Sequence, residues 1–224
     1  MAKKTPENNR RKLIEEQRKK ARAKERRGTV LTIVISSVIG IGLIGSAVYF
    51  GQKNKGPNLA LHEVGVSKEA AACDPVKEEV IPKEATDDAV KHVDSLVSYD
   101  PAPPSSGAHN PSPLPVGSKK FFSRDEDPPP ERAVHNLEHG YVVVWYDGRA
   151  TAEQVELLER AGRGARGKIL IMPWTRGNFP GDKSVVLTSW SIKQACSDVS
   201  GAVIKEFYDN HGAQKSKAPE KNAI

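Results

Sequence analysis

An uncharged, apolar run of 22 residues, from 29 to 50, constrains the fold of this chain more than any other feature. A helix of that length spans about 33 Å, which is enough to cross a hydrocarbon core of about 30 Å. A cleaved signal peptide fits less well, because the run is longer than a signal peptide's apolar region and no small-x-small cleavage site follows it. We therefore expect a single transmembrane helix over residues 29–50.

Positive charge is concentrated before this run. Residues 1–27 hold 12 Lys and Arg against 4 Glu, a net charge of +8, and the whole chain carries +6. The other residues therefore hold 22 basic and 24 acidic side chains, a net charge of −2. By the positive-inside rule, residues 1–28 form a basic cytoplasmic tail, and the residues after 50 lie on the outer side of the cell membrane. We expect no nucleic-acid binding by the folded part, because the excess of positive charge is confined to the tail.

After the membrane helix we expect a tether over 51–58, a folded domain over 59–212 and a polar tail over 213–224. Apolar periodicity and turn residues predict the elements of the domain: short strands in 59–66 and 76–81, a helix over 85–97 that includes His92, a strand over 119–123, a buried strand over 141–146, a helix that begins at Thr151 with a capping box, strands in 168–172 and 184–190, and a helix over 198–210. Six prolines in residues 99–115 exclude a helix or an inner strand there. The predicted fold class is α+β, a small mixed sheet with two or three flanking helices.

The two cysteines, Cys73 and Cys196, lie far apart and have no metal-ligand spacing. Because disulfides persist outside the cytoplasm, we expect these two residues to pair. Closing so long a loop stabilises a fold by roughly 4 to 5 kcal/mol in the chain-entropy model.

Residues 135–140, His-Asn-Leu-Glu-His-Gly, are the densest group of side chains that can do chemistry. His135 and His139 are four residues apart and share a face in a helix or a strand. In a helical turn their Cβ atoms lie roughly 6 Å apart, whereas four residues of strand separate them by about 13 Å, too far for one ion. We therefore expect a helical turn that ends at Gly140, which can take a left-handed conformation.

The first functional hypothesis is a metal centre that binds copper or zinc, because imidazole suits both ions. In this hypothesis the ligands are His135 and His139 of the helical turn and His109 or His92 of the preceding segment. A possible further ligand is Glu138 or Met172. In the alternative, the histidines hold the proline-rich loop against the sheet through hydrogen bonds of their rings. Ring nitrogens that converge on one point favour the metal; rings that turn into separate hydrogen bonds favour the scaffold.

Two other functions remain open. His-x-x-Glu-His is an arrangement in which two imidazoles bind zinc and the Glu activates water, but the helix is short and no substrate-binding segment is visible, so we lean against an enzyme. The domain can also be an accessory subunit of an envelope or respiratory complex, with an envelope protein as partner and structural histidines.

Several motifs resemble a bacterial family of unknown function that is common in actinobacteria and pairs a PPxSGxH loop with a VHxLEHG block. The residues that carry the resemblance are His92-Val93, Tyr99, Pro103-Pro-Ser-Ser-Gly107-Ala-His109, Val134-His-Asn-Leu-Glu-His-Gly140 and Leu187-Thr-Ser-Trp190. The resemblance implies a single-pass anchored protein with its domain outside, and no assigned activity. One departure is Gly117-Ser-Lys-Lys-Phe121, where relatives commonly have Gly-x-Tyr and sometimes a nearby Cys, so the role of that aromatic or thiol does not carry over.

Overall fold

The computed structural model describes residues 60–79, 90–115, 117 and 119–223, together with 15, 16, 18–20 and 22. The chain divides into two units, Met1–Gly56 and Pro57–Ile224, and the second unit is the domain described below. Within the described ranges, no helix combines the length and the apolarity that crossing a bilayer requires. The predicted membrane helix over 29–50, the tether over 51–58 and most of the basic tail lie outside these ranges.

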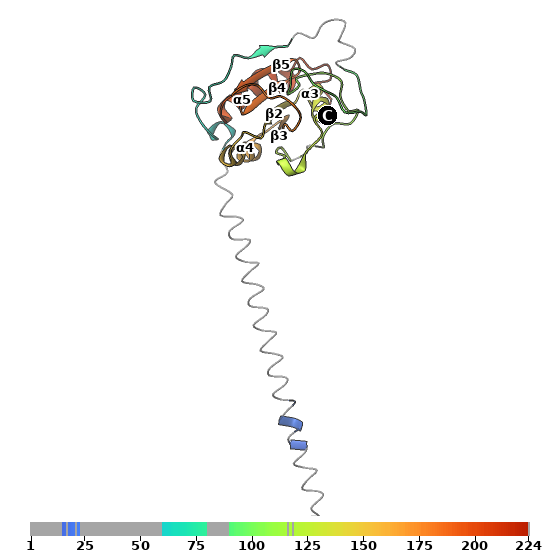
Figure 1. The fold of residues 1–224 in the computed structure, drawn as a ribbon, viewed down its shortest axis with the longest axis vertical. Coiled ribbons are helices and arrows are strands. Elements are labelled where there is room, and N and C mark those ends of the chain that lie inside the picture. The colour runs from blue at the N-terminus through green and yellow to red at the C-terminus, as the bar shows by residue number, and fades with distance from the viewer. Residues whose placement is uncertain are drawn as a thin grey trace, which may run out of the picture. The chain divides into compact units, whose positions relative to one another are not determined.

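The domain has an α+β fold built on a five-stranded mixed sheet (Figure 1). Its strands and helices are β1 (Lys77–Glu78), α3 (Pro130–Glu138), β2 (Val142–Tyr146), α4 (Ala152–Gly164), β3 (Ile169–Pro173), β4 (Val185–Ser189), β5 (Ile192–Cys196) and α5 (Gly201–His211), with 3-10 turns η1 (Leu61–Glu63), η3 (Arg124–Glu126) and η4 (Ala213–Lys215). The strand order is β1-β5-β4-β2-β3, in which β2 and β3 are parallel and the other pairs are antiparallel. The parallel pair is joined by α4, because parallel neighbours need a crossover connection.

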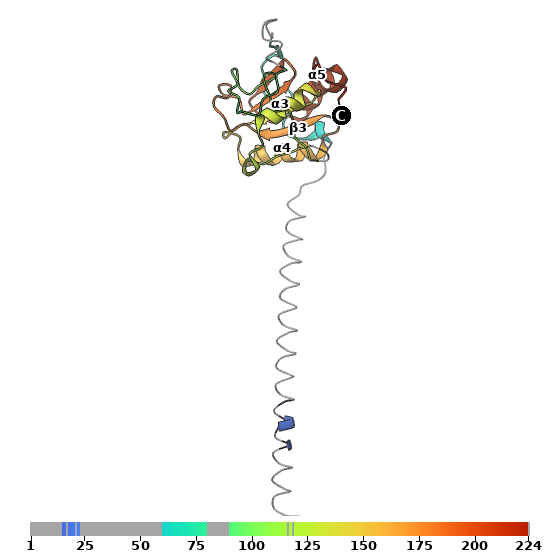
Figure 2. The same cartoon turned by 90° about the vertical axis from the view of Figure 1, so that its right-hand side faces the viewer.

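The sheet separates two apolar layers, since successive side chains of a strand point to opposite faces. Val142 and Val144 of β2 face a layer that also contains buried residues of α4 and α5. Val143 and Trp145 face a layer completed by α3 and by the proline-rich segment. Figures 1 and 2 show α3 and α5 on opposite sides of the strands. The histidine block therefore lies on one defined face of the sheet, between α3 and the proline-rich segment.

Local signals predict several elements correctly. Thr151 caps α4: its hydroxyl accepts from Gln154 N at 3.2 Å, and the Gln154 side chain accepts from Thr151 N at 3.0 Å. The strands predicted in 168–172 and 184–190 are β3 and β4, with one-residue shifts. Strand β5 was not predicted, because Lys193 and Gln194 interrupt its apolar pattern.

Three predicted elements differ in the structure. Residues 59–66 contain the 3-10 turn η1 in place of a strand, and 119–123 contributes a single bridge, between Phe121 and Ile171. The helix predicted over 85–97 is wrong for residues 90–97, which are extended or bent, while 85–89 lie outside the described ranges. Here the backbone bonds to the proline-rich segment: Val93 N donates to His109 O at 2.7 Å, and His109 N donates to Lys91 O at 2.9 Å.

Two contacts tie the ends of the domain to its centre. The predicted disulfide between Cys73 and Cys196 is present and joins the start of the domain to β5. Residues 213–223, which the sequence analysis sets apart as a polar tail, pack on the domain: Ser216 and Ala218 are buried, and Ala213 N donates to Gly140 O at 2.8 Å. The folded unit thus extends past residue 212.

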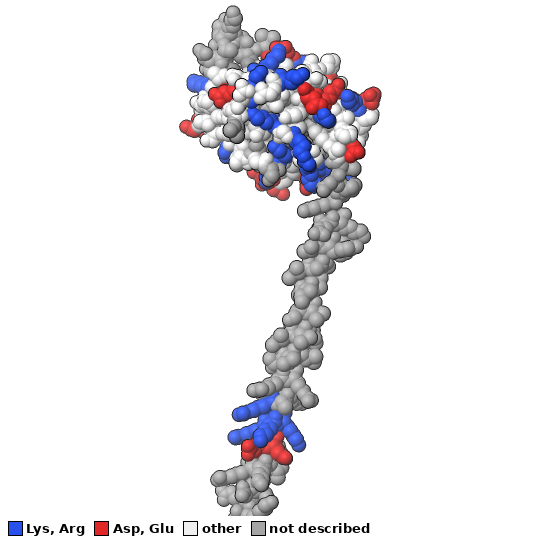
Figure 3. Space-filling view, turned by 180° about the vertical axis from the view of Figure 1, so that it is seen from behind, with Lys and Arg blue, Asp and Glu red and all other residues white. Residues whose placement is uncertain are grey.

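Charged side chains of both signs lie side by side on the face of the domain shown in Figure 3. Helix α4 carries two such pairs, Glu156 with Arg160 and Glu159 with Arg163, each at 2.6 Å. Pairs of this kind on a surface contribute less than about 1 kcal/mol each, so the apolar layers and the disulfide dominate the stability of the domain.

Candidate metal centre

Helix α3 supplies two of the side chains in the histidine block, and Gly140 ends it as the sequence predicts. Gly140 takes the left-handed conformation, with φ of +81°. Its N–H donates to Leu137 O at 2.9 Å, and Tyr141 N donates to Asn136 O at 3.0 Å, which is the Schellman arrangement of a helix C-terminus. A side chain at Gly140 would place its Cβ 3.2 Å from Ala213 O, so the close approach of the C-terminal segment also requires glycine.

Two side chains of α3 hold the proline-rich segment against the helix. The Asn136 side chain accepts from Leu114 N at 2.9 Å and donates to Leu114 O at 3.3 Å. Arg132 donates to Ser112 O at 3.1 Å and to Pro113 O at 2.6 Å. These bonds hold the segment that carries His109 against the helix that carries His135.

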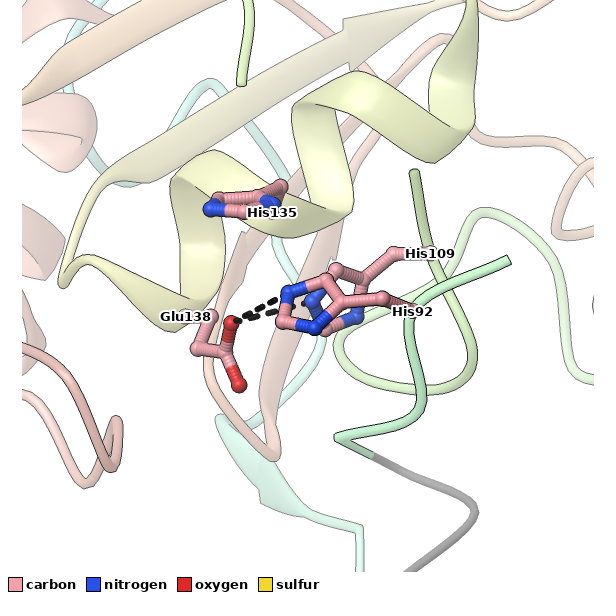
Figure 4. A group of neighbouring side chains, drawn as sticks. All are labelled: His92, His109, His135 and Glu138. Atoms are coloured by element: carbon pink, nitrogen blue, oxygen red, sulfur yellow. Dashed lines mark hydrogen bonds and ion pairs between the residues drawn. The ribbon is translucent and has the colours of Figure 1, made fainter. Parts of the chain in front are cut away.

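Four side chains converge at this junction (Figure 4). One ligand-type atom from each of His92, His109, His135 and Glu138 lies within 4.8 Å of the corresponding atoms of the other three. His135 and Glu138 are three residues apart on α3 and therefore share a helix face, while His109 comes from the proline-rich segment and His92 from the strand-like segment bonded to it. The side chains of His109, His135 and Glu138 are buried, whereas that of His92 is 42% exposed.

Backbone carbonyl oxygens orient two of the rings. His109 Nδ1 donates to Gly107 O at 2.7 Å, and His135 Nδ1 donates to Asn110 O at 2.7 Å. A carbonyl oxygen can only accept, so each Nδ1 carries hydrogen and the Nε2 of the neutral ring keeps its lone pair. This is the arrangement in which histidines bind metal ions, with the second ring nitrogen fixed by an acceptor of the protein.

Electrostatics favour the neutral, ligating form of His135. Burial lowers the pKa of His135 below 6.5, and the neighbouring His139 and His109 rings lower it further. The hydrogen bond to Asn110 and the carboxylate of Glu138 oppose this shift in pKa without cancelling it. Glu138 presents its carboxylate at the centre of the group, with Oε2 at 3.0 Å from His109 Nε2 and 3.6 Å from His92 Nε2. A buried carboxylate is costly unless it is paired, and here it lies within 3.6 Å of two imidazole nitrogens.

Residues 92–224, more than half of the chain, match the family model DUF3105, which is described as a protein of unknown function. The chain belongs to the DUF3105 family. The matched region begins at His92 and so contains all four converging side chains. No curated protein and no solved structure matches the chain.

Two of the six candidates, His139 and Met172, are not among the four converging side chains. His139 is the C-cap of α3 and is not part of the converging group; its Nε2 lies 3.1 Å from His135 Nε2 and 3.3 Å from Glu220 Oε2. Met172 of β3 is fully buried in the apolar layer that also contains Trp145. His135 and His139 lie side by side, as their spacing predicts, and of the six candidates the four that converge are His92, His109, His135 and Glu138.

Sequence reasoning did not find the atoms that orient this centre in the DUF3105 domain. The carbonyl oxygens of Gly107 and Asn110 leave no mark in a side-chain pattern, and Glu220 lies in a segment without apolar periodicity. Both outcomes of the geometric test are realised at once: the Nδ1 atoms of two rings make separate hydrogen bonds to the scaffold, while the rings themselves converge.

The donor set suits a tetrahedral or five-coordinate divalent ion. Three imidazoles and one carboxylate are ligands of zinc and of copper(II). Four ligands bound about 2.0 to 2.1 Å from one zinc ion lie about 3.3 Å from one another, so the most distant pair of the cluster would move about 1.5 Å closer on binding. Of the four side chains, that of His92 is exposed and can move without repacking a core.

Proposed function

We propose that this DUF3105 domain binds one divalent transition-metal ion, zinc or copper(II), through His92, His109, His135 and Glu138. One observation carries the proposal: the Nδ1 atoms of His109 and His135 both donate to backbone carbonyls at 2.7 Å, in a cluster that also holds the carboxylate of Glu138. Metal sites use such outer hydrogen bonds to set the tautomer and the direction of a ligating ring.

Nitrogen and oxygen donors favour zinc and copper(II) over copper(I), which prefers thiolate and thioether ligands. The sulfur atoms of Cys73 and Cys196 are joined to each other, and the thioether of Met172 belongs to an apolar layer. The centre is not closed, since the His92 side chain is 42% exposed. A site of this kind suits the holding and exchange of an ion more than a purely structural role.

We further propose that the domain is anchored to the cell membrane by residues 29–50 and faces the outer side. The uncharged run, the basic residues before it and the disulfide of the domain support this placement. A metal site outside the cell meets ions before they reach the cytoplasm.

Hydrolysis fits the site less well. In the His-x-x-Glu-His arrangement both histidines bind zinc and the Glu activates water. Here Glu138 lies inside the converging group and His139 outside it. This grouping supports a role for the Glu138 carboxylate as a metal ligand and not as a general base.

The alternative function is an accessory subunit of an envelope complex in which the histidines are structural. The bonds from Arg132 and Asn136 to the proline-rich segment favour it, because they show that α3 also serves as a support. This alternative predicts that the four side chains affect stability and bind no metal.

Metal titration of the full-length chain in detergent separates the two functions. After exposure to zinc or copper(II) and removal of loosely bound ions, we expect one ion per chain by mass spectrometry. Glu138→Gln keeps the shape of the side chain and removes its charge, and we expect it to weaken binding by at least about 100-fold, beyond the usual effect of an outer partner. Glu159→Gln on α4 is the matched control and should bind as the wild type does. A metal-free chain, or equal affinity in Glu138→Gln, would refute the proposal.

A further inference from the structure

A row of ligand-type atoms leads from the surface to the buried cluster. Glu220 Oε2 lies 3.3 Å from His139 Nε2, and His139 Nε2 lies 3.1 Å from His135 Nε2. The His135 ring in turn lies 5.0 Å from that of His92 and 5.2 Å from that of His109, measured between centroids. Exposure falls along this row: the side chain of Glu220 is 53% exposed and that of His139 is 11% exposed.

The C-terminal segment places Glu220 at the end of the row. Glu220 N donates to Glu138 O at 3.1 Å, so the segment lies directly on the last turn of α3. Lys168 Nζ donates to His139 O at 2.8 Å, to Lys221 O at 3.1 Å and to Ala223 O at 2.6 Å. A positive charge at a helix C-terminus is favourable. The Lys168 amine also joins the segment that carries Glu220 to the backbone of His139.

The spacing of the row matches that of ligands that share one ion. Two ligands of a tetrahedral zinc ion lie about 3.3 Å apart, close to both distances along the row. An ion bound by Glu220 and His139 can therefore be passed to His139 and His135, and from His135 to the cluster, without full release at any step. His135 would use its Nε2 both beside His139 and in the cluster, because its Nδ1 donates to Asn110 O.

We propose that Glu220 and His139 form the entry path through which a divalent metal ion reaches and leaves the cluster. The inference rests on the proposed function, because it assumes that the cluster binds an ion. It assigns a role to a conspicuous histidine that the cluster leaves out. His139 and Glu220 then bind the ion only in transit and are not ligands of the bound state.

A residue on a path has a kinetic signature that a ligand or a structural residue lacks. Removing it raises the barrier for entry and for exit equally, so the association and dissociation rate constants fall by the same factor and the dissociation constant stays unchanged. Removing a ligand of the bound state raises the dissociation constant. Removing a structural residue lowers the stability of the metal-free chain.

The test is stopped-flow mixing of the full-length chain in detergent with zinc ions, with release followed by chelator competition. For Glu220→Gln and His139→Phe we expect both rate constants to fall about tenfold, equal to about 1.4 kcal/mol on the barrier, with an unchanged dissociation constant. Glu78→Gln is the charge control, since Glu78 lies on β1 and pairs with Lys217 of the same C-terminal segment.

The outcomes separate this inference from the proposed function. If the wild type binds no zinc, the proposed function itself fails. If the wild type binds zinc and both variants keep its rate constants, the ion enters on the exposed side of His92 and the entry path is refuted. A higher dissociation constant with an unchanged association rate would make the two residues ligands and would also refute the path. Glu220 is exposed, so its variant folds even if His139→Phe does not.

Discussion

Gly107 is the position at which one added methyl group tests the geometry of the metal centre. Its φ of +124° is in the region that favours glycine, and its carbonyl oxygen accepts from His109 Nδ1 at 2.7 Å. A Cβ at this position would lie 3.3 Å from Tyr99 Cε1, closer than ordinary van der Waals contact. Tyr99 cannot move freely, since its hydroxyl donates to Ala108 O at 2.8 Å. Gly107→Ala therefore shifts the backbone, and with it the acceptor that orients His109.

For Gly107→Ala we expect two separable effects. Backbone strain lowers the free energy of unfolding by about 1 to 3 kcal/mol, measured by denaturant titration with a chelator present. Displacement of the outer hydrogen bond weakens zinc binding by about 10- to 100-fold, measured by competition with a zinc indicator. Gly177→Ala is the matched control: Gly177 has φ of +66° with no atom within 4 Å of an added Cβ, so it should lose stability and keep its affinity. If Gly107→Ala is destabilised yet binds zinc as tightly as the wild type, the carbonyl of Gly107 does not set the ligand geometry.

Three further predictions concern the fold. Replacing Cys73 and Cys196 by Ser should lower the free energy of unfolding by about 4 to 5 kcal/mol, and chemical reduction of the wild type should give the same value; a loss below 1 kcal/mol, well short of about 4, contradicts this. Thr151→Ala removes the cap of α4 and should cost about 1 kcal/mol in denaturant unfolding, while an unchanged midpoint would show that the cap contributes nothing. Burial, with Lys217 adding repulsion, lowers the pKa of His211 below 6.5, so the unfolded chain takes up the proton first and stability present above pH 6.5 is lost as the pH falls. With a chelator present, His211→Gln should flatten this fall; an equally steep fall means that His211 is not its source.

The elements that the sequence predicts are those with local signals. Thr151 and Gln154 define the start of α4 within four residues, and Gly140 ends α3 through its own left-handed conformation. The strand β2 is apolar at every position because both of its faces are covered. Each of these signals depends on residues that are neighbours in the chain.

The errors occur where a distant partner decides the structure. Residues 90–97 have a helical apolar spacing, but their backbone bonds to His109, so the predicted helix does not form there. Strand β5 contains Lys193, whose amine pairs with Glu79 at 2.7 Å, and this pairing compensates a residue that a sequence pattern counts against a strand. In both cases a hydrogen bond or ion pair from another segment overrides the local preference.

The site shows the same division. The helical turn at residues 135–139 follows from spacing, and so does the presence of histidines near it. All four converging residues are among the six candidates, but spacing does not separate them from His139 and Met172. The carbonyl of Asn110 orients His135, and Glu220 of the C-terminal segment lies beside His139. A pattern of side chains contains no information about a backbone acceptor 25 residues away in the chain.

X-ray absorption spectroscopy of the full-length chain loaded with one equivalent of zinc tests the four-ligand centre most directly. We predict an inner shell at about 2.0 to 2.1 Å made of three imidazoles and one carboxylate oxygen, with the multiple scattering that imidazole rings produce. In Glu138→Gln the imidazoles should remain and the oxygen contribution should change. A shell of oxygen atoms without imidazole scattering would contradict the assignment of His92, His109 and His135 as ligands.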